Sequence, residues 1–361
     1  MTRYFGSVIT DKTKGFVGRE YVFYAINEFL ANNSKGYFTI EADPGVGKSA
    51  IIAKYAQNTG CIAYFNLRSG GVNKAKEFLE NICLELIQRY ELNQSLPPNA
   101  TQNNYFLRSL LQQASDRSVN SEPVVIAVDA LDEVDISSQA SGDNILYLPK
   151  HLPEKVFFIL GRRKVKLLLE LDPMTPWQSF DLMAYRDQSL KDVKTYINNR
   201  VAESKLIRNW ITAQELTVEE FIEQLSFKSE YNFMYLCYVL RDIEQRDRQD
   251  FSLESLPQGL EDYYEKHWEL MGLNAKPQPQ DKIQIVSILA SVNQPVSCSL
   301  IAQLAAVDVW IVLEIIKEWK QFLQKQHFNK QQCYTIYHNS FRDFLNSKDE
   351  VRIARGEAVY K

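Results

Sequence analysis

The residues best suited to chemistry gather in one glycine-rich stretch, residues 37–50 (YFTIEADPGVGKSA). An apolar run leads into it, and a helix is expected to begin at Lys48 or Ser49. Gly45 and Gly47 permit positive φ, so successive backbone N–H groups can converge on a phosphate, to which the helix start adds its positive dipole end. The stretch predicts a phosphate-binding loop whose contact residues are Pro44, Gly45, Val46, Gly47, Lys48, Ser49 and Ala50.

Two side chains in this loop have roles that follow from their charge and oxygen chemistry. Lys48 would reach the β- and γ-phosphates of a nucleotide, and the hydroxyl of Ser49 would ligate Mg²⁺. The first loop position is Ala42, where the usual pattern has glycine, so the pattern is missed by one methyl group. The alternative is an ordinary glycine-rich turn, which the flanking strand and helix disfavour. We therefore expect ATP or ADP with Mg²⁺ as cofactors.

A second stretch, residues 123–135 (PVVIAVDALDEVD), is a buried-strand pattern that ends in acidic residues. Asp129 would stand at the tip of a strand beside the loop and hold the magnesium with its water shell. Either Asp132 or Glu133 would orient and deprotonate an attacking water, because phosphoryl transfer needs positioning more than covalent chemistry. A solvated acidic loop is the alternative for these two residues.

A third stretch, residues 157–163 (FFILGRR), carries a cation out of an apolar strand at the same edge of the predicted sheet. The guanidinium of Arg162 would contact the γ-phosphate there and distinguish ATP from ADP. Arg163 and Lys164 follow at once, and basic residues after a strand are common, so a merely local role for Arg162 is the alternative.

These residues require a scaffold in which strand ends meet at one edge. Short apolar runs at residues 37–41, 61–67, 124–129 and 156–160, with a possible fifth at 179–182, alternate with helical patterns such as 74–90 and 104–114. This order predicts an α/β P-loop domain with a parallel sheet and helices on both faces.

Beyond about residue 186 the apolar spacing becomes helical only, at residues 189–201, 218–225 and 231–245. A polar stretch with prolines at 274–281 resembles a linker. Helical patterns at 282–290, 298–305 and 309–322, a strand pattern at 332–337 and a helix at 340–346 suggest a winged helix. The predicted domains are therefore 1–188 (nucleotide-binding), 189–273 (helical) and 274–350 (winged helix), with a tail at 351–361 that could begin a further region.

Composition narrows the class of protein. The 361 residues include 41 Lys+Arg against 45 Asp+Glu, a net charge of -4, and the basic residues are scattered, which disfavours nucleic-acid binding. The five cysteines are far apart and mostly in apolar runs, as expected for reduced core thiols. No apolar run approaches the roughly 18 residues that span a bilayer, and no signal peptide is visible. We expect a cytoplasmic protein without a membrane partner.

Taken together, these motifs resemble the STAND class of AAA+-related ATPases, in particular its NACHT-like branch of signalling proteins. Residues 16–20 (FVGRE) resemble the entry motif of the class, and the resemblance implies that Arg19 lies near the adenine and ribose. Residues 129–133 (DALDE) resemble the acidic motif of the NACHT form, in which a small residue and a second acidic pair follow the first Asp.

The resemblance continues to residue 345. Residues 229–235 (SEYNFMY) resemble the helical-domain motif that approaches the base, and 256–268 (LPQGLEDYYEKHW) the segment that leads into a winged helix. Residues 338–345 (HNSFRDFL) resemble the motif whose histidine, here His338, reaches the β-phosphate of ADP in a closed state. Ala42 departs from the family pattern. The effector domain and repeat sensor that normally accompany this core are not visible.

The resemblance implies a switch that is closed with ADP and open, self-associating with ATP, with slow ATP hydrolysis. It also implies bacterial stress, cell-death or anti-phage signalling, with effector and sensor partners outside this sequence. The alternative function is an AAA+-like motor or loader that acts on nucleic acid through the winged helix, which the acidic balance disfavours. A P-loop kinase is a third possibility, but no lid or acceptor-binding pattern supports it.

Overall fold

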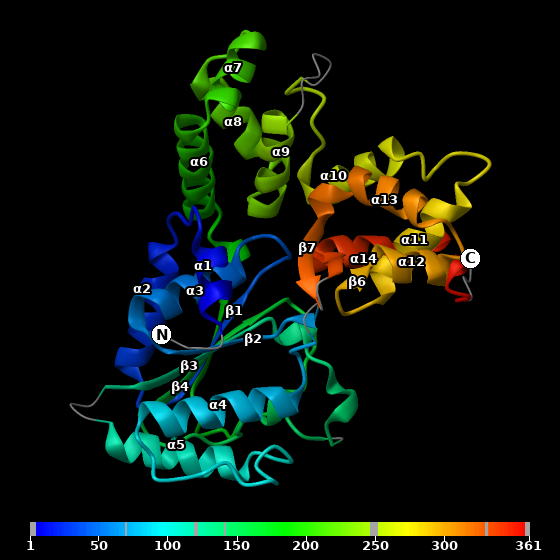
Figure 1. Ribbon diagram of the computed structural model, residues 1–361. Coiled ribbons are helices and arrows are strands. Elements are labelled where there is room, and N and C mark those ends of the chain that lie inside the picture. Colours follow the sequence, from blue (N-terminus) through cyan, green and yellow to red (C-terminus); the bar gives the residue numbers. More distant parts are fainter. Residues whose placement is uncertain are drawn as a thin grey trace. The chain divides into compact units, whose positions relative to one another are not determined.

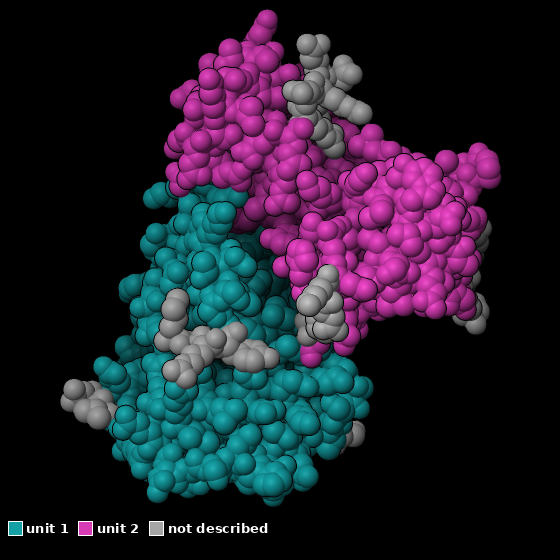
Figure 2. Space-filling view, viewed as in Figure 1, with its two compact units in different colours: residues 1–68, 72–196 teal, residues 69–71, 197–361 magenta. Residues whose placement is uncertain are grey.

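The structure, a computed structural model, describes residues 5–68, 71–118, 122–140, 142–245, 252–328 and 331–357. The chain divides into two compact units, one formed by residues 1–68 and 72–196 and the other by residues 69–71 and 197–361 (Figure 2). The division falls inside helix α6 (Arg186–Glu203) rather than at the predicted boundary after residue 188. The predicted helical and winged-helix domains both fall within the second unit.

The first unit is built on a five-stranded sheet in the order β2-β3-β4-β1-β5, and every neighbouring pair is parallel (Figure 1). The strands are β1 (Gly36–Glu41), β2 (Ile62–Phe65), β3 (Val124–Asp129), β4 (Val156–Arg162) and β5 (Trp177–Asp181). The predicted parallel sheet is confirmed, including its possible fifth strand. Strand β4 pairs with both β1 and β3 and lies between them.

Helices flank this sheet, with α1 (Gly6–Thr13) and α3 (Lys48–Thr59) on one side and α4 (Ala75–Arg89) and α5 (Tyr105–Arg117) on the other (Figure 1). Helix α4 buries Phe78, Leu79, Ile82 and Leu86, which recur every three or four residues and so form one face. Before β1, helix α2 (Glu20–Asn32) places Phe29 against Phe38 of that strand, with ring centroids 5.6 Å apart. Because helices cover both faces, strands β1 to β4 are almost continuously apolar. The edge strand β5 differs, since its first three residues are exposed.

The second unit begins with the last part of α6 and continues through α7 (Lys205–Ala213), α8 (Val218–Lys228), α9 (Phe233–Gln245) and α10 (Gly259–Leu270). The start of α8 carries a capping box, in which the Thr217 side chain accepts from the Glu220 backbone and Glu220 accepts from the Thr217 backbone. Such reciprocal bonds satisfy helix N–H groups that have no partner within the helix. The order of α6 to α10 after β5 confirms the predicted run of helices after the sheet.

The C-terminal part of this unit has α11 (Gln280–Ser291), β6 (Val296–Ser297), α12 (Cys298–Ala305) and α13 (Val309–Glu318), then β7 (Leu323–Phe328) and β8 (Gln331–Ile336). The strands form an antiparallel sheet in the order β6-β8-β7. Three helices and a hairpin thus occur in the predicted order, and the winged-helix identification remains an interpretation. Helices α14 (Asn339–Ser347) and α15 (Asp349–Ala354) follow, and α15 crosses the predicted boundary after residue 350 with Val351 buried. Residues 358–361 of the predicted tail lie outside the described residues.

An aromatic core joins the helical and C-terminal parts of the second unit. Tyr238 of α9 stacks on Tyr263 of α10, with ring centroids 5.3 Å apart, and Phe322 stacks on Phe341 of α14 at 4.1 Å. Tyr263 also meets Phe322 edge-on at 6.3 Å. Such ring pairs contribute about 0.5–1.5 kcal/mol each beyond their burial. These contacts give one continuous core to segments that the sequence assigned to two domains.

No single helix among the described residues is long and apolar enough to cross a membrane. Only the pair α12 and α13 reaches the necessary length and composition in combination, and it is bent by 113°.

Candidate nucleotide-binding site

The glycine-rich loop lies between the end of β1 at Glu41 and the start of α3 at Lys48, as predicted. Gly45 has φ 83° and Gly47 has φ 108°, values that an L side chain rarely adopts. Ala42 is fully buried, so its extra methyl group is accommodated by the packing. Residues 42–49, hereafter the P-loop, therefore have the backbone conformation that the sequence required.

Lys48 folds back onto this loop. Its Nζ donates to the carbonyl oxygens of Ala42 at 2.7 Å and Asp43 at 2.9 Å. Burial lowers the pKa of Lys48, and the negative charges of Asp132 and Asp129 partly oppose that effect. The ammonium therefore lies in the field of both acidic residues and is balanced by loop carbonyls that phosphate oxygens could replace.

Asp129 ends β3 and is 2% exposed. Burial raises the pKa of its carboxyl group, opposed by the positive charge of Lys12, a hydrogen bond with Ser49 and the charge of Lys48. Among the described residues, its Oδ1 is buried without a hydrogen-bond partner. A buried carboxylate oxygen beside a hydroxyl is the kind of donor set that Mg²⁺ takes when water and phosphate complete its shell. The predicted ligands Ser49 and Asp129 are thus brought together and fit the ion.

Gly161 of β4 explains how Asp129 and the P-loop helix meet although β4 lies between their strands. A Cβ added at Gly161 would stand 2.7 Å from Oδ1 of Asp129 and 2.5 Å from Cδ1 of Ile52 in α3. Only glycine therefore leaves space for the carboxylate and for the helix above it. The sequence analysis missed this residue, although a glycine inside an apolar strand signals close approach.

Asn66 is a second residue that the sequence analysis missed. It follows β2, is 2% exposed, and its Nδ2 donates to the backbone carbonyl of Asp129 at 2.7 Å. The bond holds the backbone of Asp129 at the end of β3, and so helps to position its side chain. The available signal was a single polar residue at the end of an apolar run.

Arg162 and Arg163 diverge at the end of β4. Arg162 pairs with Glu41 at the end of β1, where Nε lies 2.7 Å and Nη2 2.5 Å from Oε1. Arg163 pairs with Asp132, since its Nε lies 2.9 Å from Oδ2 and its backbone N–H donates to Oδ1 at 3.0 Å. The charge of Arg163 also acts on Lys48 and lowers its pKa. Arg163 therefore lies in the field of the P-loop lysine.

Glu133, the other candidate base, ends a short 3-10 helix at residues 131–133 that follows β3. Its backbone is fixed at both ends: the N–H donates to the Ala130 carbonyl at 2.9 Å, and the carbonyl accepts from Nδ2 of Asn73 at 2.7 Å. Ala130 itself has φ 55°, so the chain turns sharply after Asp129. The turn carries Asp132 and Glu133 to the same edge of the sheet, and the choice of base between them stays open.

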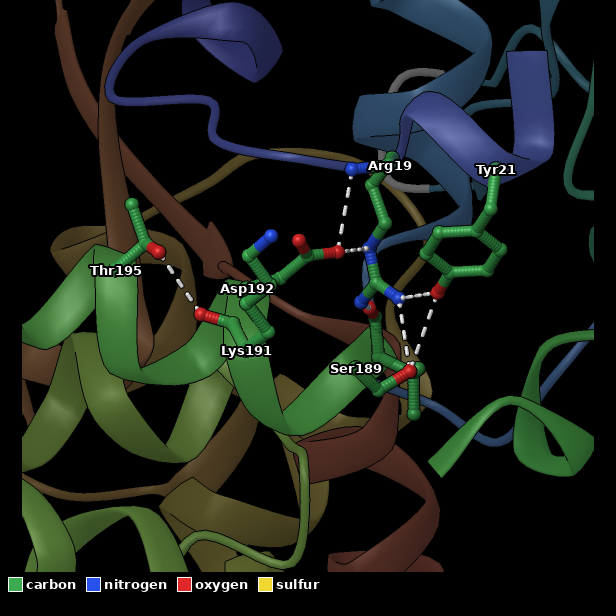
Figure 3. A network of polar contacts seen from close by, with 7 residues as sticks. Arg19, Tyr21, Ser189, Lys191, Asp192 and Thr195 are labelled. Carbon is green, nitrogen blue, oxygen red and sulfur yellow. Dashed lines mark hydrogen bonds and ion pairs between the residues drawn. The ribbon is translucent and has the colours of Figure 1, made fainter. Parts of the chain in front are cut away.

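Arg19 lies against the P-loop from the other side. Its guanidinium is 2% exposed and donates through Nη2 to the carbonyl of Val46 at 2.8 Å. Figure 3 shows its remaining partners, Tyr21, Ser189 and Asp192. The predicted position near a nucleotide's adenine and ribose stays a prediction.

His338 lies in the second unit, whereas every other candidate residue lies in the first. It is the N-cap of α14, where its Nδ1 accepts from the backbone N–H of Ser340 at 3.3 Å and lies 2.5 Å from the Ser340 hydroxyl. Because Nδ1 accepts, the neutral ring carries its proton on Nε2. Contact with a nucleotide phosphate remains a prediction for this residue.

One family model matches part of the chain. Residues 24–162 match the family model described as Nephrocystin 3, N-terminal. The matched segment runs from α2 to the end of β4, so it contains the P-loop, Asp129 and Arg162. No curated protein matches the chain in sequence.

The chain also resembles two solved structures at low sequence identity. A Signal Transduction ATPase with Numerous Domains protein from Pyrococcus horikoshii, with a tetratricopeptide repeat sensor, is 15% identical with a TM-score of 0.44, over 94% of this chain and 44% of that one. The Thermotoga maritima RuvB Holliday junction branch migration motor is 11% identical with a TM-score of 0.32, over 96% and 97%. The chain spans under half of the length of the Pyrococcus protein.

The family match, the P-loop conformation and the sheet order β2-β3-β4-β1-β5 agree with the resemblance found in the sequence. Residues 24–162 lie within a domain that has the P-loop NTPase fold.

Proposed function

We propose that this chain is the nucleotide-gated switch of a NACHT-like signalling protein, in which ADP holds a closed state and ATP an open, self-associating state. The observation that carries the proposal is the meeting of Lys48, Ser49 and Asp129 at one edge of the sheet, with Asp132 and Arg163 in the same field. This set can bind a nucleoside phosphate and respond to its terminal group.

Ser49 and Asp129 would hold Mg²⁺, which when bound neutralises charge on the β- and γ-phosphates. The P-loop N–H groups and Lys48 would bind the phosphates themselves. Asp132 is engaged by Arg163 through two contacts and must leave that pair before it can accept a proton. This favours Glu133 as the base that orients water. An Asp132 that is held in an ion pair with Arg163 is consistent with slow hydrolysis.

Arg163 is the better placed of the two arginines to sense a γ-phosphate. A phosphate beside Lys48 would compete with Asp132 for its guanidinium, because both ligands are anionic oxygens that suit the same planar fork. Arg162 is engaged by Glu41, whose side chain is 14% exposed. We therefore assign Arg163 the sensing role that the sequence analysis gave to Arg162.

Signalling output in stress, cell death or anti-phage defence is part of the proposal and comes from the resemblance alone. The partner effector and sensor domains also come from the resemblance. The cytoplasmic location is proposed from composition instead, because the five scattered cysteines are expected to be reduced core thiols. The nucleic-acid motor is disfavoured by the helix that would read DNA in a winged helix, α13. Its exposed residues include Val309, Trp310 and Leu313 with Glu314 and Glu318, whereas groove-reading helices are basic and polar.

The proposal is tested by identifying the nucleotide that co-purifies with the protein and by calorimetry with ADP. Tightly held ADP supports a switch. Lys48→Ala should remove most ADP affinity, because the loop offers no other side-chain cation of its own to the phosphates. Lys54→Ala is the matched control, since Lys54 lies on the same helix and its Nζ donates to Gln57 instead.

Magnesium dependence separates the metal site from the phosphate site. Asp129→Ala should weaken ADP binding in Mg²⁺ but much less in EDTA, because its role runs through the ion. Unchanged ADP binding by Lys48→Ala would refute the site, and equal losses of Asp129→Ala in both buffers would indicate a folding defect instead.

A further inference from the structure

Arg19 is an arginine without access to solvent in the segment before α2. Its Nη1 donates to Ser189 Oγ at 3.1 Å and Tyr21 Oη at 2.5 Å, its Nε lies 3.6 Å from Asp192 Oδ2, and its Nη2 donates to the Val46 carbonyl at 2.8 Å (Figure 3). Buried charges are costly unless they are paired and hydrogen-bonded, and this one is held from three directions. The side chain therefore joins the P-loop to the first turns of α6.

The backbone around Arg19 is shaped for the same contact. Arg19 has φ 69°, and its own N–H donates to Asp192 Oδ2 at 3.2 Å. A Cβ added at Gly18 would stand 1.9 Å from Oδ1 of Asp192. Only glycine therefore lets the Asp192 carboxylate seat against this segment, and a non-glycine residue keeps a left-handed conformation only where its surroundings hold it.

The bond to Val46 has a geometric consequence for the next residue. The Val46 carbonyl and the Gly47 N–H belong to one planar trans peptide, so they point in opposite directions. Holding the carbonyl toward Arg19 aims the Gly47 N–H away from Arg19. A positive charge on the carbonyl also polarises the peptide and strengthens its N–H as a donor.

We propose that Arg19 is a positioning residue, held by Asp192 and Ser189, that fixes the Val46–Gly47 peptide so that the Gly47 N–H faces the β-phosphate. The inference rests on the proposed function, since it concerns the same nucleotide site. It differs from the role implied by the resemblance, because the Arg19 side chain acts through the P-loop backbone and not on adenine or ribose.

The arrangement also ties nucleotide affinity to α6. Ser189 and Asp192 lie on the first turns of this helix, and the helix continues past the boundary between the two units at residue 196. A displacement of its first turns would release Arg19 and with it the Val46 peptide. By linkage, bound nucleotide would stabilise the seating of α6 by the same factor that this seating strengthens nucleotide binding.

The test uses the full chain with four variants. Arg19→Met alone would leave Asp192 as a buried unpaired charge, so it is combined with Asp192→Asn, which keeps the shape and an acceptor. Arg19→Lys keeps the charge, and Ser189→Ala removes one anchor only. The matched control is Arg117→Met, because exposed Arg117 also donates to a backbone carbonyl, that of Tyr90 at 3.1 Å, on another part of the first unit.

The direct readout is nuclear magnetic resonance after labelling valine carbonyl carbons with ¹³C and glycine nitrogens with ¹⁵N. Val-Gly pairs occur at residues 17–18 and 46–47, so a carbonyl-to-amide correlation spectrum reports on these two peptides. Val17→Ala identifies the Gly18 signal. The spectrum thus reports the chemical shifts of the Val46 carbonyl and the Gly47 N–H together. A general loss of stability would not change these two shifts selectively.

In the Arg19→Met/Asp192→Asn protein without nucleotide, we expect a changed chemical shift for the Val46 carbonyl. With Mg²⁺-ADP, we expect the Gly47 amide signal to move much less than it does in the parent. This protein should also bind ADP about tenfold more weakly than the parent. Arg19→Lys and Ser189→Ala should fall between this protein and the parent, and Arg117→Met should match the parent. Arg19→Lys and Ser189→Ala also keep the test available if the double variant does not fold.

Parent-like Val46 and Gly47 signals would overturn the inference whether or not affinity changes. Weaker ADP binding with these signals unchanged would assign Arg19 to direct nucleotide contact. If the parent protein does not bind ADP, the proposed function itself is overturned. If the parent and all variants bind ADP equally and the Val46 and Gly47 signals do not change, only the inference about Arg19 is overturned.

Discussion

The carboxylate of Asp129 lies over Gly161 on the neighbouring strand, where an added Cβ would stand 2.7 Å from its Oδ1. The strand of Gly161, β4, is the one that separates the P-loop strand from the acidic strand. The missing side chain thus leaves space for the Asp129 carboxylate, whose pKa Ser49 lowers from the far side of an intervening strand. The metal site depends on this position as much as on its ligands.

Gly161→Ala should therefore damage the metal site first. The new methyl group would collide with Asp129 and with Ile52 at 2.5 Å, and overpacking of this kind costs about 1–3 kcal/mol of stability. We expect weaker ADP binding in Mg²⁺, nearly unchanged binding in EDTA and a lower melting temperature. Gly6→Ala is the control, because a Cβ there meets nothing within 4 Å. Full Mg²⁺-dependent affinity in Gly161→Ala would show that Asp129 does not need this space.

The P-loop and the strands were predictable because their signals are local: glycine spacing, apolar runs and a helix start. The order of the strands was not, since which strand lies between β1 and β3 depends on pairings far apart in the chain. For the same reason the contacts of Gly161 and Asn66 with Asp129 were not predictable, although both residues carried a local signal. The choice between Arg162 and Arg163 needed the register Glu41–Arg162, which sends one arginine to β1 and leaves the other to Asp132.

Arg19 shows the same limit more strongly. Its partner Asp192 is 173 residues away in sequence, and neither residue type nor spacing indicates that pair. The family resemblance marked Arg19 as a site residue. The structure supplied its contact with the Val46 carbonyl.

The base can be located by comparing Glu133→Gln with Asp132→Asn. Glu133→Gln should keep ATP affinity and slow hydrolysis about a hundredfold, because a general base typically contributes about 10²–10⁴-fold. Phosphate release in a single turnover at saturating Mg²⁺-ATP measures this. Asp132→Asn loses its charge on Arg163 but keeps a hydrogen-bond acceptor, and we expect a smaller effect on turnover. Loss of turnover in Asp132→Asn alone would move the assignment by one residue.

Nucleotide discrimination separates the two arginines. Arg163→Ala should weaken ATP binding about tenfold more than ADP binding, because a charge-assisted hydrogen bond to the γ-phosphate is worth about 1.5–3 kcal/mol. Arg162→Ala should weaken both nucleotides equally, since it leaves Glu41 unpaired at the entrance to the P-loop. Calorimetry with ADP and a non-hydrolysable ATP analogue tests both. Selective loss of ATP binding in Arg162→Ala would return the sensing role to Arg162.

His338 has a structural role that must be separated from any role as a latch. Its Nδ1 caps α14 by accepting from the Ser340 backbone. Loss of a cap costs about 0.5–2 kcal/mol whatever the nucleotide does. His338→Ala alone therefore cannot distinguish the two roles, and His338→Asn is the informative partner, because asparagine caps helices well but its side chain is shorter than histidine's and lacks a ring N–H.

As a latch, His338 would donate from Nε2–H to the β-phosphate of ADP, a contact that exists only in a conformation that brings the two units together. Such a bond is worth about 1.5–3 kcal/mol when shielded from water, and a ligand biases two conformations only by its differential contacts. Both His338→Ala and His338→Asn should then release ADP about tenfold faster and give more extended or oligomeric protein in small-angle scattering. Only His338→Ala should also lower the melting temperature of the nucleotide-free protein. If His338→Asn remains as compact as the parent and releases ADP at the same rate, His338 is only the cap of α14, and the closed state must be held by other contacts.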